Sequence, residues 1–492
     1  MQTLVTGQDD DDYSAAPRAR TRQKDTDHKE KIYQYFKGPR AVQLYLKSLQ
    51  LILQHQVQFL IQDKGLPAEI EIIVRELWCL RIAKLGDKMT EAHDYDSQSQ
   101  GLTTDASGPE SDDDYALLNR KLKLNNTPGL IDCLALCYLG ITTLRLDTTP
   151  GDICDWTIND KMPYHRAIKY LPKSMKDRLP SGYHAVLDPN SLLNIERFYS
   201  VLLDIASSLQ KEHGIKWPPL NHPLLLARYI QELALPLELY HATTELARVL
   251  DYSLALSESN TGKSRVQHLP EAQLASCLVV CTKLAYPFDR RQRHPQTMGE
   301  AAAVALDWEK WLAHVDKSSE GDNEVPRKLT SKELATVQEA DIFEMADNQL
   351  DEYLDWYQDT FIDQDKHEVD EYRKDLYSWF PIDRDRSAHS PQEQDTESKT
   401  QRQLKAVSAV HGTMQPIRII KDTEGDDVVR PGQHYTYYRN LEELPDHARK
   451  FYEMVAKVAG LSLEMLVMAV FFAETAIEKR RKQDQKLATA ID

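Results

Sequence analysis

The stretch from Trp217 to Asp289 constrains the fold most, because prolines divide it into three apolar helices. Pro236 and Pro270 each stand where a proline at the first helical position would open a helix. Apolar residues recur three or four positions apart and cover much of each helix, which is typical of the central members of a bundle. Because Pro218 cannot continue an incoming helix, we predict that one helical unit ends at Trp217 and that a second follows it.

Helical periodicity continues on both sides of this stretch. Before it, apolar residues three or four apart predict helices at 39–64, 67–83, 128–146 and 192–213. After it, they predict helices at 298–314, 329–362, 441–460 and 462–486, with a short β-like stretch at 417–422. The apolar run 461–472 needs burial, so we expect the last unit to dock on the body of the protein, on another protein, or on both.

Three segments lack any apolar period: 1–37, 87–126 and 381–412. Their acidic and small polar residues cannot bury enough apolar surface to offset the entropy lost on ordering. We predict a disordered tail, a disordered acidic insertion and a linker at these positions.

The net charge of −17 is concentrated in short acidic blocks. Residues 9–12 contribute −4, residues 87–114 contribute −8 and residues 338–371 contribute −12. The rest of the chain carries +7, so a basic face is permitted and the overall charge does not exclude a nucleic-acid partner.

Two basic clusters are candidates for contact with a DNA phosphate backbone. In residues 159–183 basic side chains alternate with tyrosines and prolines, and lysine and arginine displace counterions wherever they dock on phosphates. A solvated charged face is the alternative for the same pattern. The candidates are Lys161, Arg166, Lys169, Lys173, Lys176 and Arg178, together with Arg290, Arg291 and Arg293 in a later turn.

No metal or disulfide framework is expected from the six cysteines. They form no CxxC motif and have no matching histidine pair. Cys133 with Cys137, and Cys277 with Cys281, stand four apart inside apolar helices, and we interpret them as buried core residues. Trp78 and Trp308 are expected in the core as well.

Enzyme chemistry is not visible in the sequence. The chain lacks GxGxxG, GxxxxGK[ST], HExxH and GxSxG motifs, so we predict a protein that is not an enzyme and uses no small-molecule substrate. The acidic helix at 338–371 could imitate the metal-binding aspartates of helical prenyl-transfer enzymes, but it lacks their clustered spacing and a second acidic motif. No apolar run of about 18 residues exists, so no membrane partner is expected.

Several blocks together resemble the RNA polymerase I core-factor subunit that is related to transcription factor IIB. They cover most of residues 38–290 in the order of that family, and the match is looser beyond residue 290. The blocks are GPRAVQLYLKSLQLILQHQVQFLIQDKGLPAEIEIIVRELW, GLIDCLALCYLGITTLRL with TPGDICDW, MPYHRAIKYLP with RLPSGYHAVL, and PPLNHPLLLARYIQELALPLELY with CLVVCTKLAYPFD.

The resemblance implies an all-α fold of two tandem cyclin-like five-helix repeats with a C-terminal helical extension and disordered acidic insertions. The repeats would span 38–216 and 217–380, followed by a linker at 381–412 and the extension at 413–492. It also implies a transcription initiation factor in the nucleus and nucleolus. The implied partners are RNA polymerase I, the other core-factor subunits and the ribosomal DNA promoter.

One departure from that family concerns its zinc ribbon. The family carries four zinc-binding cysteines at its N-terminus, whereas this chain has no cysteine before Cys79, so no zinc or other cofactor is expected here. The basic run PRARTRQK corresponds to the linker after the ribbon, which favours a start upstream of Met1. Candidates for polymerase contact in that linker are Arg18, Arg20, Arg22 and Lys24.

A different class of function is compatible with the same sequence. A non-enzymatic helical adaptor, cyclin-like or otherwise, would bind proteins alone, with the acidic helix 338–371 docking on a basic partner. Recovery of a kinase or ligase instead of polymerase subunits would favour it.

Overall fold

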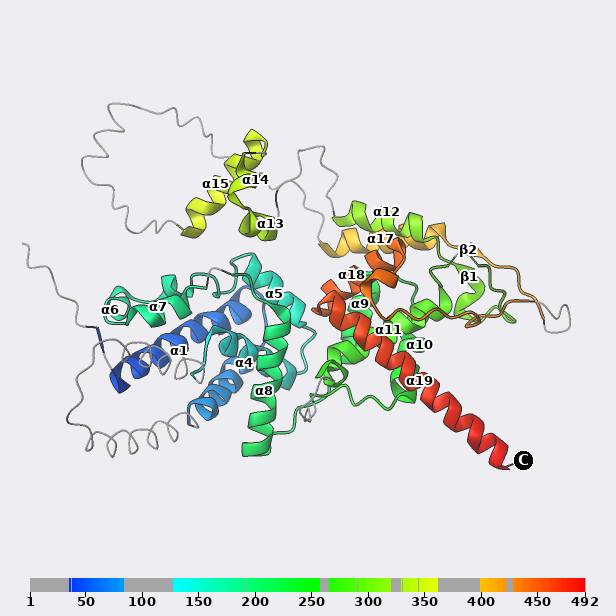
Figure 1. Ribbon diagram of the computed structural model, residues 1–492, viewed down its shortest axis with the longest axis horizontal. Helices are drawn as coiled ribbons and strands as arrows, with labels where there is room; N and C mark the ends of the chain where they lie inside the picture. The colour runs from blue at the N-terminus through cyan, green and yellow to red at the C-terminus, as the bar shows by residue number, and fades with distance from the viewer. Residues whose placement is uncertain are drawn as a thin grey trace, which may run out of the picture.

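Two helical bundles lie side by side along the long axis of the molecule (Figure 1). The computed structural model describes residues 35–83, 127–256, 265–319, 329–361, 399–421 and 428–491, except Lys37, Asn190, Arg290, Thr330 and Glu344. In these ranges the only strands, β1 (Val304–Ala305) and β2 (Gln415–Pro416), pair antiparallel over two residues. The predicted all-α class is therefore confirmed.

The first bundle is built around α4 (Leu130–Thr143). Every side chain from Cys133 to Thr142 is buried, as expected for a helix that is apolar on all sides. Around it lie α1 (Pro39–Gln62), a helix over residues 69–83, α5 (Pro150–Ile158) and α8 (Ile195–His213). Asn194 caps α8 by accepting hydrogen bonds from the N–H groups of residues 196 and 197.

The second bundle is built around α11 (Pro270–Ala285), in which every residue from 270 to 283 except Gln273 is buried. Neighbouring helices are α9 (His222–Glu232), α10 (Glu238–Val249), α12 (Trp308–Ser319), α17 (Lys399–Thr413), α18 (Asp446–Ala459) and α19 (Leu463–Ile491), with η2 (Arg265–His268) leading into α11. Both α18 and α19 pack directly on α11, and α17 packs on α9 and α12. The C-terminal helices thus form walls of the second bundle, so most of the apolar run 461–472 is buried within this chain, although Met468 is 41% exposed.

The cysteine and tryptophan predictions are confirmed. Cys133, Cys137 and Cys277 are fully buried, and Trp78 and Trp308 belong to the core. Trp308 packs with Trp311, Phe288 and Phe451, whose ring centroids lie 4.6 to 5.3 Å from its own. This aromatic group joins α12 to α18 beside α11.

Three predicted elements differ in the structure. The helix expected at 298–314 begins at Trp308, because the Asp307 carboxylate accepts the first free N–H groups, and η3 (Ala301–Ala303) and β1 precede it. The helix expected at 329–362 is divided into α13 (Ser331–Thr336), α14 (Glu339–Ile342) and α15 (Asp347–Phe361). Gln338 and Asp341 form a capping box that starts α14.

The β-like stretch expected at 417–422 lies just after β2, and the predicted linker 381–412 contains most of α17. Ile417 donates its N–H to the carbonyl of Ala303, but no strand is formed between residues 417 and 421. Helix α17 is stabilised by Val410, which is fully buried. The predicted acidic insertion 87–126 and nearly all of the tail 1–37 lie outside the described residues.

No single helix in the described ranges is long and apolar enough to cross a membrane. Helices α18 and α19 pass a test of length and composition only as a pair bent by 100°.

Candidate nucleic-acid interface

The basic segment 161–178 lies on the first bundle between α5 and α8 (Figure 1). It contains η1 (Ala167–Tyr170) and α6 (Lys173–Lys176), and α7 (Ser181–Leu187) follows it. Pro172 and Pro180, with φ of −64° and −61°, stand at the N-caps of α6 and α7, so neither η1 nor α6 can continue through them. The side chains of Lys161, Lys169, Lys173 and Arg178 are exposed, and that of Lys176 is half-buried.

The tyrosines of this segment hold it against α1. Tyr183 stacks on Tyr45 with ring centroids 4.6 Å apart, and Tyr170 lies 5.5 Å from the ring of His55. Gln56 of α1 donates a hydrogen bond of 2.6 Å to the carbonyl of residue 163. The aromatic side chains therefore position the basic groups, and four of those groups are left facing solvent.

Arg166 differs from the other candidates because its guanidinium is already engaged. Its backbone is left-handed, with φ of 46°, at the start of η1. Its side chain lies 3.7 Å from the Asp188 carboxylate and donates a hydrogen bond of 3.3 Å to the carbonyl of Thr360 in α15. The acidic helix α15 thus reaches the basic segment at this residue.

Lys176 and Arg178 also make contacts within the first bundle. The Lys176 ammonium donates to the carbonyl of Lys169 at 3.3 Å. The Arg178 guanidinium lies 5.7 Å from the ring centroid of Phe36, whose N–H donates to the carbonyl of Arg178 at 2.9 Å. All six candidates of the first cluster lie on this one segment of the first bundle.

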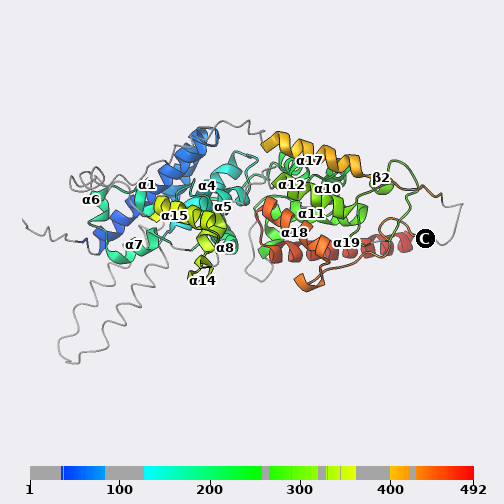
Figure 2. The same ribbon diagram turned by 90° about the horizontal axis from the view of Figure 1, so that it is seen from above.

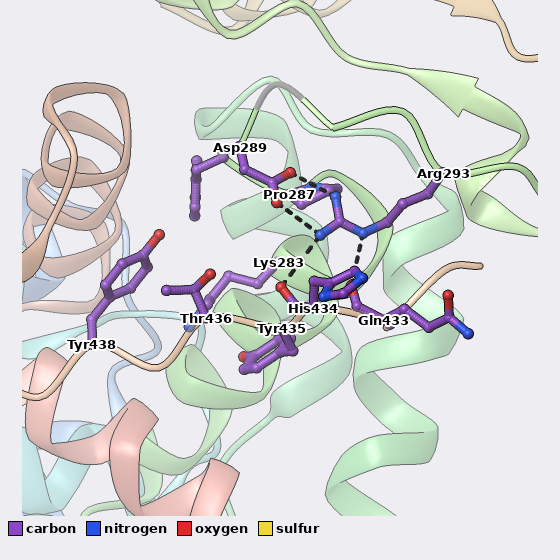
Figure 3. Close-up of a pocket in the computed structure, with 11 residues that line it drawn as sticks. Lys283, Pro287, Asp289, Arg293, Gln433, His434, Tyr435, Thr436 and Tyr438 are labelled. Atoms are coloured by element: carbon purple, nitrogen blue, oxygen red, sulfur yellow. Dashed lines mark hydrogen bonds and ion pairs between the residues drawn. The ribbon is translucent and has the colours of Figure 1, made fainter. Parts of the chain in front are cut away.

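The second cluster does not form a comparable surface, and Arg293 is a correction to the predicted DNA contacts. Its side chain is 6% exposed and binds both carboxylate oxygens of Asp289 at 2.6 and 2.9 Å (Figure 3). It also donates to the carbonyls of Gln433 and His434, so it holds the segment 428–440 on α11. A guanidinium occupied in this way cannot bind phosphate. Arg291 is exposed.

Five further candidates lie outside the described residues. They are Arg290 and the four residues of the basic tail, Arg18, Arg20, Arg22 and Lys24.

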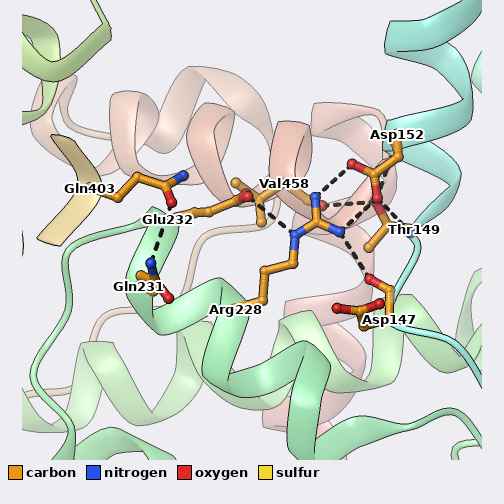
Figure 4. A network of polar contacts seen from close by, with 8 residues as sticks. All are labelled: Asp147, Thr149, Asp152, Arg228, Gln231, Glu232, Gln403 and Val458. Carbon is orange, nitrogen blue, oxygen red and sulfur yellow. Dashed lines mark hydrogen bonds and ion pairs between the residues drawn. The ribbon is translucent and has the colours of Figure 1, made fainter. Parts of the chain in front are cut away.

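The junction between the two bundles is fixed by a half-buried group of polar contacts (Figure 4). Arg228 of α9 donates to both carboxylate oxygens of Asp152 in α5, at 2.7 and 2.6 Å, and to Glu232 in its own helix at 3.1 Å. Its hydrogen bonds to Asp152 and Glu232 raise its pKa although burial opposes them. The Thr149 hydroxyl, at the start of α5, also donates to the carbonyl of Val458 in α18.

The central helices of the two bundles also meet directly. The Tyr138 hydroxyl of α4 donates a hydrogen bond to the Glu271 carboxyl of α11, and both side chains are fully buried. Burial raises the pKa of Glu271, and the hydrogen bond from Tyr138 opposes that shift. One continuous apolar core includes residues of both bundles, so the bundles pack as one body.

No site for chemistry is apparent in the described part of the chain. The hollow between α11 and residues 432–438 has a volume of about 20 Å³, room for a single water, and a more open depression of about 410 Å³ lies beside Asp188 and His184. No group of three or more metal-binding side chains occurs among the described residues.

The junction residues were missed in the sequence, although one signal for them was present. The sequence TPGD contains a capping box, in which Thr149 and Asp152 bond to each other's backbone N–H groups, with Pro150 at the first helical position. It therefore starts α5, where we expected only the end of a preceding helix. Arg228 gave no comparable signal, because its partner lies 76 residues away.

Two bundles built around buried helices, joined by one continuous apolar core and carrying a basic segment on one side, define a tandem helical-repeat protein. Family models identify the repeats. The model for the Rrn7/TAF1B N-terminal cyclin domain matches residues 49–173, and that for the Rrn7/TAF1B C-terminal cyclin domain matches residues 191–361. Together they cover more than half of the chain, which therefore belongs to the Rrn7/TAF1B family and has the predicted tandem cyclin folds.

Relatives from fungi and plants agree with this assignment. The chain is 23% identical to the RNA polymerase I-specific transcription initiation factor rrn7 of Schizosaccharomyces pombe, over 90% of this chain and 85% of that protein. It is 24% identical to the factor RRN7 of Saccharomyces cerevisiae, over 71% of this chain and 63% of that protein. A TATA box-binding protein-associated factor of RNA polymerase I from Oryza sativa is 24% identical over 66% of this chain and 54% of that protein.

A solved structure supports the fold. A chain in the crystal structure of S. cerevisiae core factor matches 92% of this chain and 100% of its own length, with a TM-score of 0.50 and 18% identity.

Proposed function

We propose that this chain is an RNA polymerase I-specific transcription initiation factor, a core-factor subunit that binds the ribosomal RNA gene promoter and recruits the polymerase. The observation that carries this proposal is the match of both cyclin-domain models, in order, to residues 49–173 and 191–361. The names of the fungal relatives support it, because the first of them aligns with nearly the whole chain. A nuclear location follows from this role, and we expect the protein in the nucleolus.

The architecture suits assembly. The bundles are fixed to each other by Arg228 and by the contact between Tyr138 and Glu271, so the outer surfaces keep a constant relative position. The exposed lysines of segment 161–178 would bind phosphates without reading bases, which leaves promoter choice to DNA shape and to the other subunits.

Purification of the tagged full-length chain from its own cells tests the assignment. We expect RNA polymerase I and other core-factor subunits to copurify, and depletion of the chain to reduce ribosomal RNA synthesis. Recovery of a kinase or ligase without any polymerase I subunit would contradict the proposal and favour a protein-binding adaptor.

A charge-reversal experiment tests the DNA surface in the assembled factor. Replacing Lys169, Lys173, Lys176 and Arg178 by glutamate should weaken promoter binding and make log Kd less dependent on log salt, by about 0.9 per lost phosphate contact. The matched control reverses the basic residues at the exposed end of α19, Lys479, Arg480, Arg481 and Lys482. Equal losses in both variants would mean that segment 161–178 makes no specific contact.

A further inference from the structure

The acidic helices α13 to α15 lie against the first bundle, although they follow the second bundle's α12 in sequence. Figures 1 and 2 both show α15 on the side of the first bundle, away from the second bundle. The contact is made at Thr360, in the last turn of α15. Arg166 donates to its backbone carbonyl at 3.3 Å, and its hydroxyl forms a hydrogen bond with the Asp160 side chain.

The end of α15 that meets Arg166 carries negative charge in two forms. The last carbonyls of a helix have no partner within the helix and form the negative pole of its dipole, so the Arg166 guanidinium caps them. In addition, α15 contains five carboxylates and no basic residue, and residues 329–361 contain nine carboxylates against Lys332. At Arg166 the basic segment therefore meets a helix that is negatively charged, as a phosphate backbone is.

The attachment of these helices is limited. Leu354 and Tyr357 on α15 are 52% and 44% exposed, and Phe343 between α14 and α15 is 90% exposed. Core helices such as α18, in contrast, bury most of their apolar side chains, including Phe451, Tyr452 and Val455. A unit that buries little apolar surface is held with little free energy, so a competing ligand can displace it.

We propose that α13 to α15 compete with duplex DNA for the basic segment 161–178, and that promoter DNA displaces them. This inference depends on the proposed function. In the free chain Arg166 binds the end of α15, and in the DNA complex the same guanidinium binds a phosphate. The competition keeps the segment from binding unrelated DNA while leaving it available where the other subunits already hold the promoter.

Neutralising α15 tests the competition. In the assembled factor, Asp351→Asn, Glu352→Gln and Asp355→Asn together should tighten promoter binding several-fold at low salt, and the gain should shrink as salt screens the charges. The control variant removes the same charge at exposed positions of other helices, with Glu76→Gln, Glu212→Gln and Glu453→Gln. Equal affinities of the two variants would overturn the inference.

A covalent lock tests the displacement itself. Cysteines at positions 160 and 360, where the side chains now meet, can be cross-linked in a Cys79→Ser background that removes the exposed native thiol. Cross-linking should weaken DNA binding by tenfold or more, reduction should restore it, and bound DNA should slow the cross-linking. A locked protein that binds DNA as well as the reduced protein would overturn the inference.

These results separate the inference from the proposed function. If the glutamate variant of segment 161–178 loses DNA while the α15 variants behave like their controls, only the competition fails. If the glutamate variant binds DNA like the wild type, the DNA surface itself is misplaced.

Discussion

Gly151 and Gly460 meet backbone to backbone at the junction of the two bundles. A Cβ atom on Gly460 would lie 2.0 Å from the amide nitrogen of Gly151, and one on Gly151 would lie 2.8 Å from the carbonyl oxygen of Lys457. Gly460 also ends α18 in the left-handed conformation, with φ of 70°. The first turn of α5 can approach the end of α18 this closely only because both positions lack side chains.

Replacing Gly460 by alanine should separate the bundles. The left-handed conformation costs about 1–2 kcal/mol for a residue with a Cβ, and the clash with Gly151 adds to this. Gly214→Ala is a matched control, because Gly214 ends α8 with φ of 67° and has open space around its Cβ position. We expect urea unfolding to show a larger loss of unfolding free energy for Gly460→Ala than for Gly214→Ala. Equal losses would mean that the close approach contributes nothing.

Arg228 is expected to stabilise the junction much more than a surface arginine does. Its removal leaves Asp152 without its two charged hydrogen bonds, and Arg228→Ala should cost about 1–3 kcal/mol of unfolding free energy. Arg228→Lys should recover only part of this, because an ammonium cannot bind both carboxylate oxygens in the same planar geometry.

Arg248 provides the comparison for Arg228. It pairs with Glu245 at 2.6 Å, but its side chain is 78% exposed, so Arg248→Ala should cost less than about 0.5 kcal/mol. If calorimetry or urea unfolding gave the same loss for both arginines, the contact with Asp152 would not stabilise the junction.

The buried Glu271 should make stability depend on pH. Burial raises its pKa, so the folded protein holds this proton more tightly than the unfolded chain. The stabilising contribution of the neutral acid is complete below the ordinary value of 4.5 and is lost as the pH rises through the folded pKa. Glu271→Gln, which can still accept from Tyr138, should therefore gain stability over the wild type as the pH increases.

Unfolding free energies of both proteins from about pH 5 to about pH 8 measure this effect. Glu453→Gln, an exposed change of the same chemistry, is the control. If the unfolding free energies of the wild type and Glu271→Gln differed by a constant amount over this range, the pKa of Glu271 would be the same in the folded protein and in the unfolded chain.

The sequence contains enough information to predict the central helices of both bundles. Helices α4 and α11 are apolar on all sides, and such helices are stable only when other helices surround them. The end of α8 has a local cause as well, since Gly214 closes the helix in the left-handed conformation and Pro218 and Pro219 could not continue one. The Trp217 indole donates to the carbonyl of Ala206, which places this residue with the first bundle.

Contacts between distant residues were not predictable in this way. The location of α15 depends on Arg166 and Thr360, which are 194 residues apart, and neither residue type specifies its partner. Arg293 is different, because Asp289 stands four residues before it and could have suggested an ion pair. The sequence shows where charged residues stand along the chain, but their solvent exposure in the folded protein decides whether they are available to DNA.

Replacing Lys283 alone should lower the free energy of unfolding strongly, whereas replacing both Lys283 and Glu474 should lower it little. The two side chains are 4% and 1% exposed and 2.6 Å apart, and Tyr435 also donates to Glu474. Burial lowers the pKa of Lys283, and Glu474 opposes that shift. Lys283→Met leaves a buried carboxylate without its counter-charge and should cost about 3–5 kcal/mol. Adding Glu474→Gln, which keeps an acceptor for Tyr435, should restore most of the unfolding free energy that Lys283→Met loses.

Urea unfolding of the single and double variants measures this recovery, and hydrogen exchange of residues 433–438 shows whether the segment over α11 opens in the single variant. Lys310→Met is the exposed control, because Lys310 and Asp307 pair at 3.2 Å with side chains 51% and 41% exposed, and it should change stability by less than about 0.5 kcal/mol. If the double variant were as unstable as Lys283→Met, the uncompensated charge would not be the cause. The contact of the Lys283 ammonium with the rings of Tyr435 and Tyr438, whose centroids lie 4.4 and 4.6 Å from it, would then explain the loss, because methionine has no cation to replace it.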